Sequence, residues 1–388
     1  MKIRSIECVR LQLPARANPT PPRRPSYNQS ARRAFPINKY PEFPRQLRKI
    51  PGEVADEMWV KVTAEDGSWG IGTCHWGKLV EPLVREHYAP LLCGRDCFAI
   101  EFLNDLMWRS TQRFGATGLA AVGRSAIDLA LWDLKGKLLR VPVYSLLGGP
   151  CREEINCYAT SDDLDWSMEL GFKAFKVSNP VHYEEGTEGL NQLEEKIAKA
   201  RETVGPDADL MFNPVMSFNV DFAVRLMERL RPYRLRWIEE PLMPHDTDGL
   251  VQLKKAVPTL PIATGEDHKG RHALRELVDR RCVDVIQPEL RWAGGLSEAL
   301  KVYTIAEAAG LTTIPHSGAG LPFGQHFHFA LPEAHLAEYW LGSDPGVPLA
   351  EAQKLPGVQV PVNGRLRPSD APGFGIEVKE EQLVPWRQ

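Results

Sequence analysis

Three side chains with oxygen donors stand at regular intervals in the second half of the chain. Asn213, Glu239 and Glu266 are separated by 26 and 27 residues, and each ends a short apolar run typical of a β-strand. Each interval is about one strand-plus-helix repeat, so the three would face one point in a parallel barrel. Oxygen ligands suit a hard divalent cation such as Mg²⁺. Alternatively, the three side chains could cap the helices that follow them. Because all three stand at the same place in successive strand-plus-helix repeats, capping is the weaker interpretation.

A histidine and an acid follow two neighbouring predicted strands. His316 ends one strand, and Glu289 lies just beyond the strand before it. A carboxylate that binds one imidazole nitrogen fixes the tautomer and raises the basicity of the other nitrogen. The pair therefore predicts a general base, although a lone histidine is more often structural. By contrast, His326 and His328 are predicted to lie on the next helix and to serve packing or the surface.

Other polar side chains close further predicted strands, namely Lys176, Ser178 and Glu338. The segments predicted as strands in this region are 155–160, 174–178, 209–213, 235–239, 262–266, 283–287, 312–316 and 337–341. Because amphipathic helical patterns alternate with them, the sequence indicates the α/β class with a parallel β/α (TIM-type) barrel. Its active site would gather at the carboxyl ends of the strands. The stretch is short for that fold, so one irregular unit is expected, and a doubly wound sheet is the alternative.

The barrel pattern occupies residues 146–343. Residues 1–145 instead show three alternating strand patterns followed by helical ones, which predicts an N-terminal α+β capping domain. Residues 344–388 are rich in proline and are expected to pack back on the capping domain. Two domains are also the sensible expectation for 388 residues.

Composition excludes several classes of protein. The net charge of −3 argues against a nucleic-acid binder, and no apolar run has the roughly 20 residues that span a bilayer. The N-terminus alternates like a strand and lacks the apolar core of a signal peptide. Seven scattered cysteines are typical of reduced thiols. We therefore expect a cytoplasmic protein with no nucleic-acid or membrane partner.

Charge is nevertheless distributed unevenly. The segment 14–51 contains nine prolines and nine basic residues against one acid, Glu42, and so carries +8. So many prolines exclude a regular element there. The segment is either a solvated insertion or a lid that brings positive charge to an anionic substrate. Within it, Arg45 and Arg48 are the candidates for contacting a substrate carboxylate.

Taken together, these motifs resemble the enolase superfamily and, within it, the mandelate racemase-like group. The motifs that carry the resemblance are Lys176-x-Ser178, Asn213, Glu239-Glu240-Pro241, Gly265-Glu266, Gln287-Pro288-Glu289, Gly294-Gly295-Leu296 and Pro315-His316. The stretches Asn38-Lys39-Tyr40, Pro361-Val362-Asn363-Gly364-Arg365 and Pro372-Gly373-Phe374-Gly375 look most like L-rhamnonate dehydratases. The resemblance covers nearly the whole chain.

The resemblance implies a role for each matching residue. Glu239, Glu266 and Asn213 would hold Mg²⁺, with Asn213 at a position where the family has Asp. His316 would remove the proton next to the substrate carboxylate and then help to expel hydroxide, while Glu289 orients it. The remaining site residues would be Lys176 and Glu338 as catalytic groups, with Ser178, Asp267 and His268 near the substrate.

Ser178 decides between reaction types. Racemases of the group have a second lysine there, so this chain offers an evident base on one face only, which favours dehydration of a small sugar acid such as L-rhamnonate. The alternatives are a racemase, epimerase or cycloisomerase, or a catalytically impaired sugar-acid-binding homologue because of Asn213. Members of the family usually form homo-oligomers, and the same is expected here.

Overall fold

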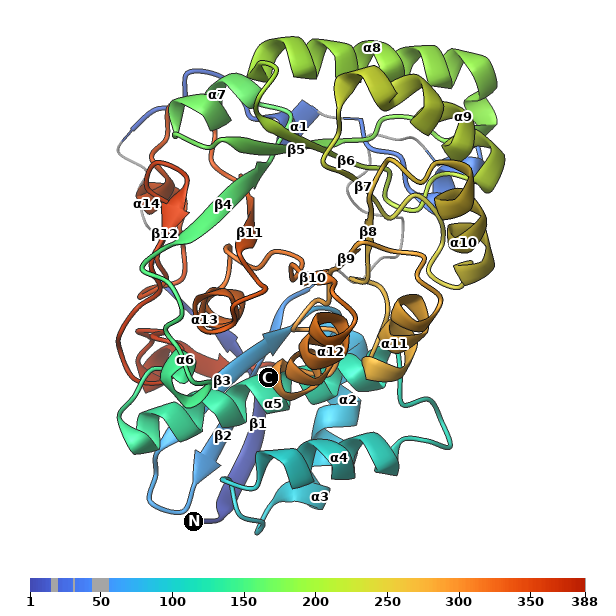
Figure 1. Ribbon diagram of the computed structural model, residues 1–388. Helices are drawn as coiled ribbons and strands as arrows, with labels where there is room; N and C mark the ends of the chain where they lie inside the picture. Colours follow the sequence, from blue (N-terminus) through green and yellow to red (C-terminus); the bar gives the residue numbers. More distant parts are fainter. Residues whose placement is uncertain (15–19, 31, 44–55, 388) are drawn as a thin grey trace.

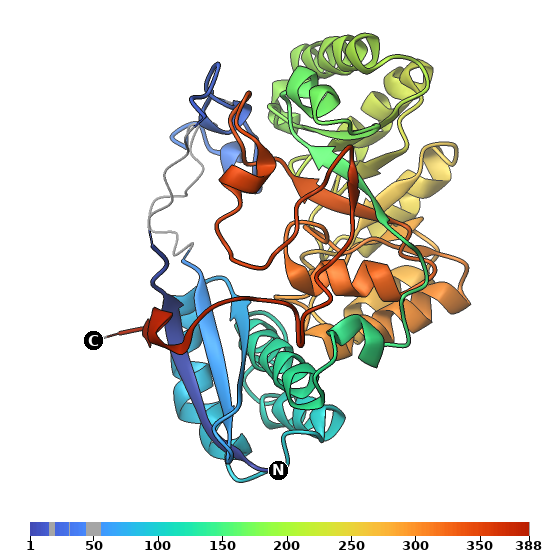
Figure 2. The same cartoon turned by 90° about the vertical axis from the view of Figure 1, so that its left-hand side faces the viewer.

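The computed structural model describes residues 1–14, 20–30, 32–43 and 56–387, which form two sheets with their covering helices (Figure 1). The first sheet is antiparallel and has the order β13-β1-β2-β3. Its strands are β1 (Ile3–Leu11), β2 (Met58–Ala64), β3 (Trp69–Cys74) and β13 (Leu383–Pro385). Figure 2 shows the C-terminal segment running from the barrel to this sheet. The last strand of the chain thus pairs with the first.

Helices cover one face of the first sheet. They are α2 (Gly77–Pro82), a π-helical turn (Leu83–Tyr88), α3 (Ala89–Leu92), α4 (Ile100–Ser110) and α5 (Leu119–Leu139). The long helix α5 approaches β3 closely because β3 carries glycine at positions 70 and 72. A Cβ at Gly72 would lie 2.2 Å from the carbonyl oxygen of Ala126, and one at Gly70 would lie 2.3 Å from that of Ala130. Glycine is therefore required by the helix–sheet distance.

The second sheet is the predicted parallel barrel. Its strands are β4 (Ile155–Thr160), β5 (Ala174–Ser178), β6 (Asp209–Asn213), β7 (Trp237–Glu239), β8 (Ile262–Thr264), β9 (Val285–Ile286), β10 (Thr312–Thr313) and β11 (Leu336–Trp340). The eighth strand, β11, pairs in parallel with the first, β4, and the remaining neighbours follow chain order. A doubly wound sheet would instead reverse its order at a switch point. The prediction of the barrel is confirmed, with no ladder between β10 and β11 among the described residues.

The barrel helices lie outside the strands (Figure 1). They are α6 (Val143–Leu146), α7 (Leu164–Glu169), α8 (Gly186–Val204), α9 (Val220–Leu230), α10 (Thr247–Ala256), α11 (Arg271–Asp279), α12 (Leu296–Ala308) and α13 (Pro322–Ala330). The short elements are α1 (Tyr27–Ser30), α14 (Leu349–Ala352), the strand β12 (Arg365–Leu366) and 3₁₀ turns at Pro36–Lys39, Tyr183–Glu185, Arg231–Tyr233 and Glu380–Gln382. The expectation that prolines exclude any regular element in 14–51 is therefore wrong, because residues 26–35 contain no proline and Pro36 stands at the start of its turn, where its missing N–H is tolerated. His326 and His328 are buried on α13, so of the two roles predicted for them, packing or the surface, the structure favours packing. None of the described helices has the length and apolar character needed to cross a bilayer.

Four barrel strands are shorter than their sequence patterns predict. β7, β8, β9 and β10 contain two or three residues each. Proline lacks the N–H that a ladder requires, and Pro288 and Pro315 lie just past β9 and β10. Gly265 follows β8 with φ of +138°, outside strand geometry. As a result, Glu266, Glu289 and His316 lie on the loops beyond the strands.

An apolar layer inside the barrel supports the layer of polar side chains. It takes one residue from each strand or its continuation: Tyr158, Ala174, Met211, Trp237, Ala263, Val285, Ile314 and Leu336. Side chains alternate between the two faces of a strand, so residues two positions apart share a face. The interior positions two residues further along include Lys176, Asn213, Glu239, Gln287, His316 and Glu338. The alternation therefore places these polar residues together at the carboxyl end of the barrel.

Candidate active site at the carboxyl ends of the strands

The centre of the polar layer is an ion cluster around Lys176. Its ammonium contacts the carboxylate of Glu239 and lies 2.8 Å from Oε1 of Glu338. The three side chains are nearly inaccessible, with 2%, 0% and 2% exposure. Burial lowers the pKa of Lys176, but the two carboxylates outweigh it and hold that pKa well above its ordinary value. The two carboxylates therefore favour the protonated form of Lys176.

Both carboxylates of this cluster receive further hydrogen bonds. Glu239 accepts from Nδ2 of Asn213 (2.7 Å), Nε1 of Trp237 (3.1 Å) and Nε2 of Gln287 (2.8 Å). Glu338 accepts from the hydroxyl of Thr160 and, at 2.9 Å, from the backbone N–H of Ser317. Burial opposes ionisation of Glu338, yet the ammonium of Lys176 prevails and lowers the pKa to about 2. Glu338 is thus held as a carboxylate.

His316 and Glu289 form the pair that their spacing predicts. Nδ1 of His316 lies 2.8 Å from Oε2 of Glu289, and Nε2 lies 3.6 Å from Oε2 of Glu266. Burial lowers the pKa of His316, but Glu266 and Glu289 together raise it to about 10. The side chain keeps 21% exposure, so part of the imidazole ring is open to the surroundings. This is the geometry of an oriented acid–base group.

Arg291 also belongs to the site, although the sequence motifs did not predict it. Its Nε and Nη2 donate to the two oxygens of Glu289 at 2.9 and 2.8 Å, and the residue is 7% exposed. Burial opposes the charge on Glu289, but Arg291 and His316 hold its pKa far below the ordinary value. Nη1 of Arg291 also lies 3.3 Å from His75, which follows β3 of the capping domain. The only sign of this role in the sequence is that an arginine follows the strand-end acid by two residues.

Replacing Arg291 by alanine should lower kcat by about 10- to 100-fold, because Glu289 then loses the bidentate hydrogen bonds that orient it toward His316. KM should change little, since Arg291 is shielded from substrate. Lysine at this position should restore only part of kcat, because an ammonium cannot bind both oxygens in the same plane. Steady-state kinetics with thermal unfolding of each variant test this, with the exposed Arg275→Ala on α11 as control. An Arg291→Ala enzyme with normal kcat would contradict it.

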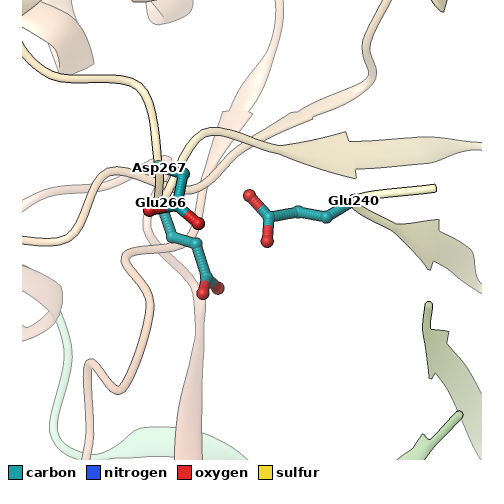
Figure 3. A group of neighbouring side chains, drawn as sticks. All are labelled: Glu240, Glu266 and Asp267. Carbon is teal, nitrogen blue, oxygen red and sulfur yellow. The ribbon is translucent and has the colours of Figure 1, made fainter. Parts of the chain in front are cut away.

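Three carboxylates, one of which is that of Glu266 beside His316, gather next to one another in Figure 3. Glu240, Glu266 and Asp267 bring one oxygen each within 4.8 Å of one another. Burial and the neighbouring acids raise the pKa of Glu240 well above its ordinary value and that of Glu266 to about 7. Such a group of oxygens has the donor chemistry that a divalent cation prefers. We call Glu240, Glu266 and Asp267 the acidic trio.

Of the predicted cation ligands, Asn213, Glu239 and Glu266, only Glu266 belongs to the acidic trio. The carbonyl oxygen of Asn213 accepts the backbone N–H of Val215 at 2.7 Å, and its amide nitrogen donates to Glu239. Glu239 points into the Lys176 cluster instead. The complete predicted set therefore stays a prediction, and the acidic trio is the group with carboxylate oxygens facing one another.

The remaining predicted substrate residues have separate surroundings. The hydroxyl and the backbone N–H of Ser178 both donate to Asp162. His268 is buried, and burial lowers its pKa to about 4. Asp267 is in the acidic trio and lies 3.1 Å from Nζ of Lys269. Their roles toward a substrate stay predictions.

The described part of the basic segment lies along the rim of the barrel. Arg24 pairs with Asp163 and, at 2.6 Å, with Asp165, while Arg23 lies 2.6 Å from Glu169. The backbone N–H of Ala34 donates to the carbonyl of Asn179 beyond β5. These arginines therefore attach the segment to acids of the barrel. Arg45 and Arg48, the predicted carboxylate contacts, lie outside the described residues.

A parallel barrel with an acid–base pair and clustered carboxylates at its strand ends, capped by an antiparallel α+β domain, defines a class of two-domain enzymes. Residues 44–148 match the family described as "Mandelate racemase / muconate lactonizing enzyme, N-terminal domain", and residues 162–382 match "Enolase C-terminal domain-like". The chain belongs to the enolase superfamily, in its mandelate racemase and muconate lactonizing enzyme group.

Individual proteins of known annotation or structure are also similar to this chain. The L-rhamnonate dehydratase of Saccharopolyspora erythraea is 36% identical over 352 residues, which cover 90% of each chain. A putative L-rhamnonate dehydratase of Caldivirga maquilingensis is 35% identical over 90% of this chain and 88% of its own. The structure of rhamnonate dehydratase from Gibberella zeae complexed with Mg superposes with a TM-score of 0.89 at 31% identity, covering 99% of this chain and 96% of the other.

Proposed function

We propose that this enzyme is a Mg²⁺-dependent acid-sugar dehydratase that converts L-rhamnonate or a related aldonate to a 2-keto-3-deoxy acid. The observation that carries the proposal is the His316–Glu289 pair, in which Nδ1 faces Glu289 and Nε2 lies beside Glu266. The names of the relatives support the same reaction, and one of them is a complex with Mg.

The charge state of Lys176 favours elimination over racemisation. A racemase needs a second base on the opposite face of the reacting carbon, and a lysine can serve only when it is neutral. Glu239 and Glu338 keep Lys176 protonated, and the other polar side chain of β5, Ser178, is bonded to Asp162. His316 is therefore the group placed to move protons.

In the proposed reaction, Nε2 of His316 accepts the proton from carbon 2, the carbon next to the substrate carboxylate. The same imidazole then returns a proton to the hydroxyl on carbon 3, which leaves as water, and the resulting enol tautomerises to the 2-keto-3-deoxy acid. Glu289 holds the ring through Nδ1 during both transfers. A divalent cation at Glu266 would supply positive charge for the substrate carboxylate and offset the carboxylates that keep His316 protonated.

Turnover of a library of sugar acids with Mg²⁺ in deuterated water tests the proposal. We expect a keto-deoxy acid from L-rhamnonate or a close relative, detected by NMR and by a carbonyl-specific assay. Recovery of substrate labelled at carbon 2, without any keto acid, would instead indicate a racemase or epimerase. Binding of sugar acids without turnover would indicate an impaired homologue.

A further inference from the structure

We infer that His75 and Trp292 are positioning residues for His316: the capping domain fixes the indole of Trp292 through His75, and the indole fixes the plane of the imidazole of His316. The inference deepens the proposed function and rests on it, since His316 is the acid–base group of that reaction. It gives the capping domain a part in the proton transfers themselves.

The first argument is that the bond to Glu289 leaves one motion of His316 free. That bond joins Nδ1 of His316 to Oε2 of Glu289 at 2.8 Å and fixes the direction in which Nδ1 points. The ring can still pivot about the line between these two atoms, because the terminal torsion of a histidine side chain has only a broad preference. Such a pivot moves Nε2, the nitrogen that exchanges protons with the substrate. A contact with the flat face of the ring would prevent it.

The second argument is that Trp292 supplies this contact. Its indole lies 5.4 Å from the imidazole of His316, measured between ring centres, with an angle of 34° between the ring planes. Aromatic rings at such separations attract one another beyond the effect of the area that they bury. An aromatic face also attracts a cation. The indole can therefore hold the imidazole in both of the protonation states that acid–base catalysis requires.

The third argument is that the indole is anchored in the other domain. Trp292 follows β9 of the barrel, but it packs in the hydrophobic core of the capping domain, whose other buried members lie between Ile3 and Leu134. Its Nε1 donates to Nδ1 of His75, which follows β3, at 3.1 Å. Burial, together with the charge of Arg291, lowers the pKa of His75 to about 4. At neutral pH the His75 ring is therefore uncharged and can accept this bond.

Trp76 completes the contact on the side of the capping domain. Its ring lies 5.2 Å from that of Trp292, and the ring of His75 lies 5.6 Å from it. Trp76 has a left-handed φ of 57°, which is costly for a bulky residue and persists where the surrounding structure imposes it. From the barrel, Nζ of Lys269 lies 4.9 Å from the centre of the Trp292 ring. Groups of both domains therefore hold the indole in place.

Removing the acceptor at residue 75 tests the inference. His75→Phe keeps an aromatic ring but cannot accept from the indole, so kcat of the Mg²⁺-loaded enzyme should fall by about 5- to 20-fold as His316 is misplaced. KM should stay within about twofold, because the loss falls on proton transfer rather than on substrate binding. His75→Asn should restore most of kcat, since its amide oxygen can accept in place of Nδ1. A residue that only fills space would not be rescued in this way.

The ring-proton NMR signals of His316 report the same contact without turnover. The ring current of a neighbouring indole shifts these signals, so they should move in His75→Phe and stay near their wild-type positions in His75→Asn. Selective carbon-13 labelling of histidine makes the signals visible, and His316→Asn assigns them. Because this measurement needs no substrate, it distinguishes failure of the inference from failure of the proposed function.

Trp132→Phe is the matched control for a general loosening of the two domains. The indole of Trp132, on α5, donates to the hydroxyl of Ser297 on α12 at 2.9 Å, so it too makes a hydrogen bond between the capping domain and the barrel. Its loss should leave both kcat and the signals of His316 unchanged.

Thermal unfolding verifies that each variant is folded. If His75→Phe does not fold, Trp292→Phe takes its place, because it removes the donor of the same hydrogen bond. A normal kcat in the variant would overturn the inference, as would unchanged signals of His316 or an equal loss of kcat in Trp132→Phe.

Discussion

His316→Asn lowers the turnover of the sugar-acid substrate by about 10²- to 10⁴-fold, the range that general acid–base groups contribute. Asparagine retains a polar side chain that can bond Glu289 but has no nitrogen that can accept a proton at Nε2. The variant should also lose exchange of the carbon-2 proton with deuterium, because that exchange requires the same nitrogen. Steady-state kinetics and NMR exchange measure the two effects.

A matched substitution separates this result from a general loss of histidine. His272 is exposed on α11 and stacks on Trp108 with a ring separation of 5.4 Å, far from any proton transfer proposed here. His272→Asn should therefore turn over substrate normally. If His316→Asn retained full turnover and exchange, the assignment of the base would be wrong and the proposed mechanism with it.

Lys176→Met should destabilise the protein by about 3–5 kcal/mol, the cost of removing one partner from a buried ion pair. The methionine would leave Glu239 and Glu338 close together without the ammonium between them. Nearby amide, indole and hydroxyl donors cannot supply the lost charge. Chemical denaturation should show the loss in the free energy of unfolding.

Two further variants test the origin of that loss. Lys173→Met, at an exposed lysine just before β5, should change the free energy of unfolding by less than about 0.5 kcal/mol. Adding Glu239→Gln to Lys176→Met should recover part of the lost stability, because one of the two carboxylates left without the ammonium is then neutral. A Lys176→Met protein as stable as wild type would show that the cluster is not held by this ammonium.

Period-two alternation made the inner polar layer predictable. Met211 precedes Asn213 by two positions, and Trp237 precedes Glu239 in the same way, so each pair shares a face of its strand. The His316–Glu289 contact could be predicted for a related reason, since both follow neighbouring strands of a parallel sheet. The lengths of the strands were less predictable, because apolar residues continue past the point where the ladder ends.

Contacts between segments that are far apart in the chain could not be predicted from the sequence. The acids that bind Arg23 and Arg24 lie about 140 positions away along the chain, on and before α7, so their pairing with the basic segment followed only from packing. Arg291 was missed because its role depends on a guanidinium that folds back onto Glu289 in a buried environment.

By itself the sequence determined the barrel, the capping domain and the set of strand-end residues, because these depend on local periodicity and repeat spacing. Only the tertiary structure decided how the acids of that set divide. Glu239 and Glu240 are identical neighbours, but Glu239 ends β7 and Glu240 leaves the strand with a left-handed φ of 45°. One reaches Lys176 inside the barrel and the other faces Glu266 and Asp267. The physical reason is that a carboxylate takes its function from the charges around it, and those charges come from different strands.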